Sequence, residues 1–138
     1  MNVWLCPVKP RSWRIVKKFK MFGVPKHIRK VFNQVRPGDL LVFHVLSPVN
    51  GIVAIGKVTS QMFEANQDIW GKARYPLRVN IEIPCEHLRH DNKPIPLSAL
   101  IGAKSSEIQI EPYLRNVWIT KITKKQYQNI RKYFSCIP

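Results

Sequence analysis

The sequence predicts an α+β fold in which helices pack around a small, mostly antiparallel sheet or open barrel. Apolar runs rich in β-branched residues stand on both sides of Asn50-Gly51, which is typical of two strands joined by a hairpin. Three other stretches carry helical spacing of apolar residues. The predicted strands follow one another closely along the chain, and such neighbours usually pair antiparallel.

The first third of the chain is expected to hold one strand and two helices. The strand covers residues 2–8, and Ser12 can cap a helix that runs to about Lys20. Pro25 suits the first position of a second helix. The apolar residues of that helix fall at i, i+3, i+4 and i+7 and predict a buried stripe: Ile28, Val31, Phe32 and Val35.

The central hairpin is expected to form the core of the sheet. Pro37-Gly38 predicts a turn, and the apolar runs over residues 40–45 and 52–58 predict strands. Their nearly continuous apolarity indicates that both faces are covered. Gly56 interrupts the second strand, which indicates a bulge or a close approach by another backbone or a ligand.

The second half alternates strands and loops before a final helix. Residues 61–72 are expected to form a loop, 77–83 an alternating strand, 84–96 an irregular loop and 96–101 a short helix. Strands over 107–111 and 117–122 precede a capping box at residues 123–126. The helix that it opens should pack three side chains inward: Tyr127, Ile130 and Phe134.

The charge balance makes nucleic acid the first partner to consider. Residues 1–138 are expected to form a single domain, with 23 Lys and Arg against 8 Asp and Glu and a formal charge of +15. Neutralising phosphates with counterion release gives such a surface affinity for nucleic acid without sequence preference. The sequence shows neither a membrane-length apolar run nor a leader peptide, so we expect a cytoplasmic protein that does not bind membranes.

The cysteines predict reduced thiols and no metal site. Cys6, Cys85 and Cys136 are odd in number and widely spaced, which favours a reducing compartment. Cys85, His87 and His90 offer zinc-binding atoms, yet their crowding in one loop matches no common zinc spacing. Structural or surface roles are therefore favoured, and no cofactor motif is present.

The basic residues are concentrated at the N-terminal end. Residues 1–38 contain ten Lys and Arg and no acidic residue. A solvated face normally mixes charges of both signs, so this one favours an anionic partner. Five candidates for contacts with the nucleic-acid backbone lie in this segment: Arg11, Arg14, Lys26, Arg29 and Lys30.

The aromatic residues divide into two groups. Trp4 and Trp118 lie within strand patterns and are expected in the core. Trp13, Phe22 and Trp70 lie at element boundaries, where rings more often line pockets. A basic surface with such rings is typical of proteins that hold single-stranded or flipped-out bases by stacking.

Several short motifs, in this order and spacing, resemble the EVE domain family. These domains are related to YTH domains within the PUA-like superfamily. The motifs are Trp4-Leu5 followed by Trp13, Phe22-Gly23-Val24-Pro25, Val35-Arg36-Pro37-Gly38-Asp39, Ile55-Gly56-Lys57-Val58 and Tyr75-Pro76-Leu77-Arg78-Val79. The resemblance implies a PUA-like pseudo-barrel wrapped by helices. It also implies a binding module without catalysis, which holds a modified nucleobase of DNA or RNA in an aromatic pocket.

The resemblance also implies which residues form that pocket. Phe22, opening the motif that continues with Gly23 and Val24, would be one wall, and Trp70 would face it. Lys9 and Trp13 would contact the edge of the base. Many relatives have Trp in place of this Phe, and a small polar residue in place of this Lys, so stacking and the identity of the base can differ here.

Three alternatives stay open at this point. A PUA-like module can recognise structured RNA by shape, without a modified base. An enzyme would need clustered carboxylates, and the eight acidic residues form no recognisable catalytic motif. A basic domain can also dock onto an acidic protein. An open slot between Phe22 and Trp70 would favour base recognition over shape recognition.

Overall fold

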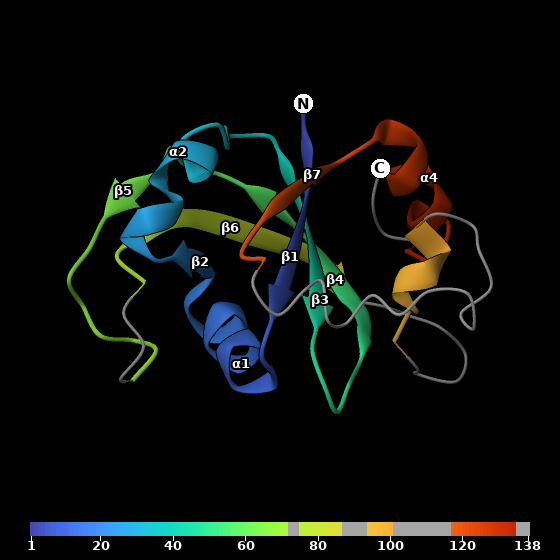
Figure 1. The fold of residues 1–138 in the computed structure, drawn as a ribbon, viewed down its shortest axis with the longest axis horizontal. Coiled ribbons are helices and arrows are strands. Elements are labelled where there is room, and N and C mark those ends of the chain that lie inside the picture. The colour runs from blue at the N-terminus through green and yellow to red at the C-terminus, as the bar shows by residue number, and fades with distance from the viewer. Residues whose placement is uncertain (72–74, 87–93, 101–116, 135–138) are drawn as a thin grey trace.

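The sheet curls into a half-barrel with helices on both of its sides (Figure 1). The computed structural model describes residues 1–71, 75–86, 94–100 and 117–134. The strands lie in the order β2-β6-β4-β3-β1-β7, and β5 also pairs with β6. Their bounds are β1 Val3–Val8, β2 Met21–Val24, β3 Leu40–Val45, β4 Gly51–Val58, β5 Phe63–Glu64, β6 Leu77–Glu86 and β7 Thr120–Ile122.

The predicted central hairpin is confirmed as the core pair. β3 and β4 pair antiparallel, and successive side chains enter two hydrophobic clusters on opposite faces of the sheet. The register shifts at Gly56 where β4 pairs with β6, so the predicted bulge is present. A Cβ there would lie 2.9 Å from the ring of Phe43. The bulge therefore also lets a core ring approach the backbone closely.

Helices cover the two faces unequally. α1 Pro10–Phe19 and α2 Arg29–Phe32 pack on one side of the sheet, and α4 Lys124–Arg131 packs on the other (Figure 1). The predicted capping box of α4 is confirmed, because the hydroxyl of Thr123 accepts from the Gln126 amide at 3.1 Å. A short 3-10 helix, η2 Leu97–Leu100, lies within the predicted short helix.

The N-terminal third differs most from the prediction. α1 begins at Pro10 after an N-cap at Lys9, earlier than the predicted cap at Ser12. Residues 21–24, predicted as a connector, form β2 and pair with β6. The reason lies at Lys20, which ends α1 in the left-handed region at φ 53° and turns the following residues into an extended strand.

The predicted helix at Pro25 is also shorter than expected. It consists of the 3-10 helix η1 Lys26–Ile28 followed by the four residues of α2. Phe32 and Val35 are buried as predicted, but Val31 is 38% exposed, so the stripe is only partly right. This segment has no side-chain cap and no acidic residue in its first turn, and both would have stabilised a longer helix.

The second half follows the predicted order with shifted bounds. β6 extends past the predicted end at residue 83, and β5 forms inside the predicted 61–72 loop. Of the strand predicted over 117–122, only 120–122 are extended. The strand predicted over 107–111 lies outside the described residues. β1 pairs parallel with β3, an exception to the mostly antiparallel sheet.

Candidate functional site

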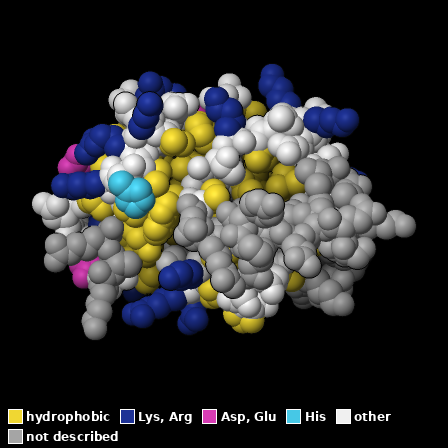
Figure 2. Space-filling model, viewed as in Figure 1, with side chains coloured by type: hydrophobic (Ala, Val, Ile, Leu, Met, Phe, Trp, Pro, Cys, Tyr) yellow, Lys and Arg dark blue, Asp and Glu magenta, His cyan; other side chains and the backbone are white. Residues whose placement is uncertain are grey.

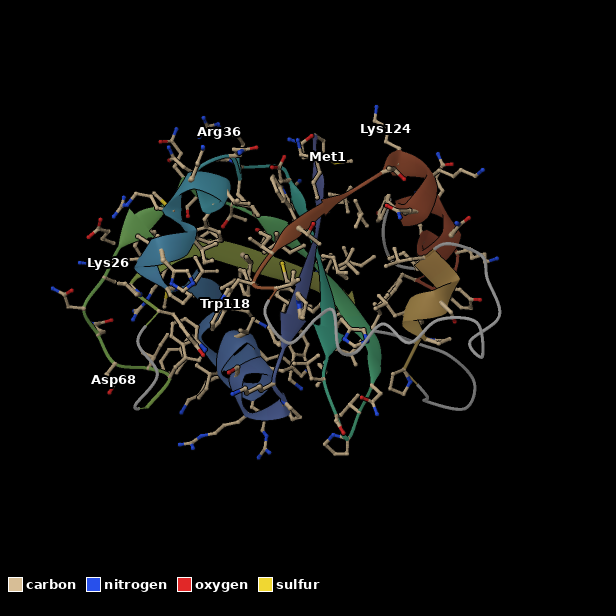
Figure 3. All side chains as sticks on the ribbon, viewed as in Figure 1. Met1, Lys26, Arg36, Asp68, Trp118 and Lys124 are labelled. Carbon is tan, nitrogen blue, oxygen red and sulfur yellow. The ribbon has the colours of Figure 1, made fainter. Side chains whose placement is uncertain are left out.

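A cavity opens beside the sheet where β1 ends and α1 begins. It has a volume of about 520 Å³, which includes its open mouth. α1 and β2 form two sides, and the segments that carry Trp70, Tyr75 and Trp118 complete it. Figure 3 shows the labelled Trp118 beside α1 and β2. The lining residues are Pro7, Val8, Lys9, Ser12, Val16, Phe22, Gly23, Leu46, Trp70, Tyr75, Val117 and Trp118.

Three aromatic rings form a row along the cavity. Trp70 and Tyr75 have ring centroids 5.4 Å apart, and Tyr75 and Trp118 5.2 Å apart, both edge-to-face. Such contacts stabilise a pair by about 0.5–1.5 kcal/mol beyond the area that it buries. Tyr75 and Trp118 are half-buried, whereas Trp70 is 7% exposed. Tyr75 and Trp118 therefore offer the most accessible ring surface to a ligand.

Phe22 lies deeper than the other rings. It is 3% exposed and packs edge-to-face against Phe32 at 6.0 Å and Phe43 at 5.7 Å. Its ring is thus part of the hydrophobic core and forms the floor of the cavity. Phe22 and Trp70 both line this cavity, but their ring contacts are with different neighbours.

Gly23 allows the row of rings to approach the sheet. A Cβ at this position would lie 2.9 Å from Cη2 of Trp70 and 3.0 Å from Cβ of Tyr75. Real Cβ atoms essentially never come within 3.0 Å of a neighbour, so any side chain here would displace the Trp70 ring and press on Tyr75. The lack of a side chain at Gly23 therefore lets Trp70 and Tyr75 form this wall of the cavity.

The polar edge of the cavity consists of Lys9, Ser12 and the hydroxyl of Tyr75. Burial raises the pKa of Tyr75, and the hydrogen bond with the Ser12 side chain partly opposes this shift. The phenol is consequently protonated at neutral pH and can donate or accept a hydrogen bond. Lys9 is exposed, directly follows β1 and is the N-cap residue of α1.

Four of the six residues predicted for the pocket line this cavity: Lys9, Phe22, Gly23 and Trp70. The other two lie in the adjoining core. Trp13 packs on Phe43 with centroids 5.0 Å apart, and Val24 is fully buried. The functional roles of all six stay predictions.

Sequence reasoning missed two rings and one hydroxyl of this cavity. Trp118 lies next to a strand and was expected in the core, but it is half-buried and lines the cavity. Tyr75 precedes Pro76 directly before β6, and this boundary position was the available signal. Ser12 was expected as a helix cap. Trp4, by contrast, is 2% exposed, as predicted.

Basic side chains surround a hydrophobic band on one face of the molecule (Figure 2). Figure 2 shows Lys and Arg above and below a hydrophobic band on the viewed face, with acidic groups at one edge. All five residues predicted to contact the nucleic-acid backbone are exposed. Arg29 forms an ion pair with Glu64, and this hydrogen-bonded cation lowers the pKa of that carboxyl. Arg29 is therefore the one among the five whose charge is largely balanced.

A second hollow lies against the first. It is lined by Lys26, Ala65, Asn66, Gln67, Asp68, Tyr75, Pro76 and Arg78. Tyr75 lines both spaces, and Lys26 lines the second. Arg11 reaches the other end of the row, where its Nη2 would lie 3.4 Å from a Cβ on Gly71.

Within the described ranges, no three His, Cys, Asp or Glu side chains gather in a group that could hold a metal ion. His87 and His90 of the predicted surface cluster lie outside these ranges. No helix in the described part of the chain is long and apolar enough to cross a membrane.

Residues 2–133 match the family model of the EVE domain. The chain belongs to the EVE domain family. The curated UPF0310 protein PH1033 of Pyrococcus horikoshii is 29% identical to this EVE domain over 140 residues, which cover 91% of this chain and 82% of the relative.

Solved structures show the same fold. Human THYN1, in complex with DNA containing 5-methylcytosine, superposes with a TM-score of 0.65 at 13% identity and covers 100% of both chains. The YTH domain of Mmi1 in complex with RNA gives 0.62 at 10% identity, covering 95% of this EVE domain and 76% of that chain. The PUA-like fold implied by the sequence motifs is confirmed.

Proposed function

We propose that this EVE domain binds nucleic acid without catalysis and holds a modified, methylated nucleobase in the cavity beside α1. The observation that carries the proposal is a cavity walled by Trp70, Tyr75 and Trp118, with the exposed cation of Lys9 in its lining. The complexes of human THYN1 with 5-methylcytosine DNA and of the Mmi1 YTH domain with RNA support it. The lining offers Lys9, Ser12 and Tyr75 as hydrogen-bonding side chains.

The energetics favour a base taken out of its stack. Unstacking a nucleotide costs a few kcal/mol. Stacking on a protein ring returns about 1–3 kcal/mol per base. Tyr75 and Trp118 meet edge-to-face, so a base stacks on one of them, and this contact can offset most of the cost. Phosphate contacts then supply net affinity.

A methyl group on the base would gain from the apolar floor of the cavity. Val16, Phe22 and Leu46 line it, and burying one methyl carbon there gives about 0.8 kcal/mol. That corresponds to roughly fourfold discrimination. Higher selectivity requires hydrogen bonds to the edge of the base, which Ser12 and Tyr75 are placed to make.

Binding to a panel of oligonucleotides tests the proposal. The panel carries methylated or unmodified bases in DNA and in RNA, and titrations are followed by fluorescence anisotropy. We expect one methylated base to be preferred. Trp118→Ala should weaken binding of that oligonucleotide by about 5- to 150-fold, the equivalent of one lost stacking contact.

Lys57→Ala is the matched control, because Lys57 is exposed on β4 and lines a different hollow. It should leave the base preference unchanged. Equal binding of every oligonucleotide by the unchanged protein would contradict base recognition and favour recognition of RNA shape.

A further inference from the structure

We propose that Arg78 is a positioning residue, which holds Trp70 and Tyr75 in the arrangement that a bound base requires. The inference rests on the proposed function for its effect on binding. Arg78 lies on β6 in the second hollow, behind the row of rings. Its side chain is 3% exposed, so it acts on a ligand through the rings.

The guanidinium contacts both ring-bearing segments. Its Nε donates to the carbonyl oxygen of Tyr75 at 2.9 Å, and its carbon lies 5.1 Å from the ring centroid of Trp70. Its Nη2 donates to the carbonyl oxygen of Gln67. One planar group thus joins the chain before Trp70, the Trp70 ring and the backbone of Tyr75. A guanidinium can stack on a ring and donate in its own plane at the same time.

Arg78 and Gly23 together determine the position of the Trp70 ring. The two residues are direct partners in the antiparallel β2–β6 pair, so their Cα–Cβ directions point to the same side of the sheet. Gly23 leaves the space into which Cη2 of Trp70 projects, and Arg78 supplies the contact to the ring. The strand register therefore places the gap over Gly23 next to the guanidinium of Arg78, and the Trp70 ring occupies this position.

A buried guanidinium at this position has a desolvation cost. Burial disfavours the charged guanidinium and lowers the pKa of Arg78, while the negative charge of Asp68 opposes this shift. Nη1 of Arg78 is buried and has no hydrogen-bond partner within the described chain. An apolar side chain would avoid this desolvation, but it would leave the carbonyl oxygens of Tyr75 and Gln67 without the guanidinium donor. We infer that the guanidinium of Arg78 is used to hold Trp70 and Tyr75 in a fixed arrangement.

Rings that are ordered before binding reduce the entropy lost when a base enters. Without Arg78, Trp70 would keep its place over Gly23 but lose the group that limits its rotation. We expect the affinity for the preferred methylated oligonucleotide to fall about tenfold when this ordering is lost. The salt dependence of binding should not change, because Arg78 is buried and does not meet phosphates.

The test uses Arg78→Met and Arg78→Lys in the full chain. The ¹⁵N relaxation of the Trp70 indole N–H is measured in the free protein, with Trp70→Phe to assign the signal. We expect its order parameter to fall in both variants, since lysine cannot stack and donate in one plane. Binding of the panel is then measured at several salt concentrations, with Lys57→Met as the control for loss of a cation.

The outcomes separate this inference from the proposed function. An unchanged Trp70 order parameter in both Arg78 variants overturns the positioning role, whatever the protein binds. A lower salt slope in the variants also overturns it, because Arg78 would then contact phosphate. If neither variant folds, Gly23→Ala displaces Trp70 from an intact Arg78, and unchanged ring order and binding there overturn the proposal. In a further outcome, the Trp70 ring loses order in the Arg78 variants while the unchanged protein binds every oligonucleotide equally. That result supports the positioning role of Arg78 and contradicts base recognition.

Discussion

Phe22 shows that one ring can belong to the core and to a binding cavity at once. Its position in a conspicuous motif suggested a pocket wall, and the ring does line the cavity. Yet its edge-to-face contacts with Phe32 and Phe43 place most of it inside the hydrophobic core. A change at this residue therefore affects folding before it affects recognition.

We expect Phe22→Ala to lower the free energy of unfolding by about 3–5 kcal/mol, because it removes a fully buried ring and leaves a cavity. Urea denaturation followed by circular dichroism measures this. Phe22→Leu, which keeps most of the volume, should lose much less. A loss below about 1 kcal/mol for the alanine variant would show that the ring is not part of the core.

Asp39 belongs to the Pro37-Gly38 turn, but it also forms hydrogen bonds with residues distant in the sequence. The Pro37-Gly38 turn accounts for its place in the chain, but its carboxylate is 3% exposed. It accepts hydrogen bonds at 3.0 Å from Nε1 of Trp4 and from the backbone amides of Asn2 and Arg36. The turn therefore fastens the start of β1 to the start of β3, which aligns the parallel pair that leads to the cavity.

At the scale of elements, η1 and α2 carry cations that differ in availability. Lys26 and Lys30 are exposed, whereas Arg29 is paired with Glu64. A cation that already has a carboxylate partner must give it up to neutralise a phosphate. The three residues are alike in sequence, and only the position of β5 distinguishes them.

We predict that Lys26→Gln with Lys30→Gln lowers the slope of log affinity against log salt by about 1.4 for single strands or 1.8 for duplex DNA. Adding Arg29→Gln should change the slope little further. Titrations of an unmodified oligonucleotide between about 50 and 200 mM salt measure this. An undiminished slope in the double variant would place the phosphate contacts on other elements, such as α1.

At the scale of the whole molecule, buried groups set the response to alkaline pH. Burial raises the pKa of the Cys6 thiol well above its ordinary value of 9.0. It also raises the pKa of Tyr75 and Tyr127 above 10.0. Each group holds its proton more firmly in the folded protein than in the unfolded chain. Their stabilising effect is therefore complete below the unfolded pKa values and is lost as the pH rises from those values through the higher folded pKa values.

We expect the free energy of unfolding to decline from about pH 9 upward, first through Cys6 and then through the tyrosines. Urea denaturation at pH 7, 9, 10 and 11 measures the decline. Cys6→Val should remove the part that begins near pH 9, because it removes the buried thiol. Parallel pH curves for the variant and the unchanged protein would contradict a role of Cys6.

Much of the fold could be predicted because local signals specify it. The strands at 40–45 and 52–58, the bulge at Gly56 and the capping box at Thr123 depend on residues near one another in the chain. Apolar patterning, backbone freedom and hydrogen bonds to the nearest amides decide such features. The high positive charge and four of the lining residues were also available from the sequence and its motifs.

The tertiary structure alone decided how these parts meet. Residues 21–24 become a strand because β6 pairs with them, and β1 lies parallel to β3 across a long crossover. Trp118 and Tyr75 line the cavity because their rings pack edge-to-face in one row. Arg78 contacts Trp70 because the strand register pairs Arg78 with Gly23. These contacts join residues distant in sequence. Their geometry follows from packing of the whole chain, which no local pattern encodes.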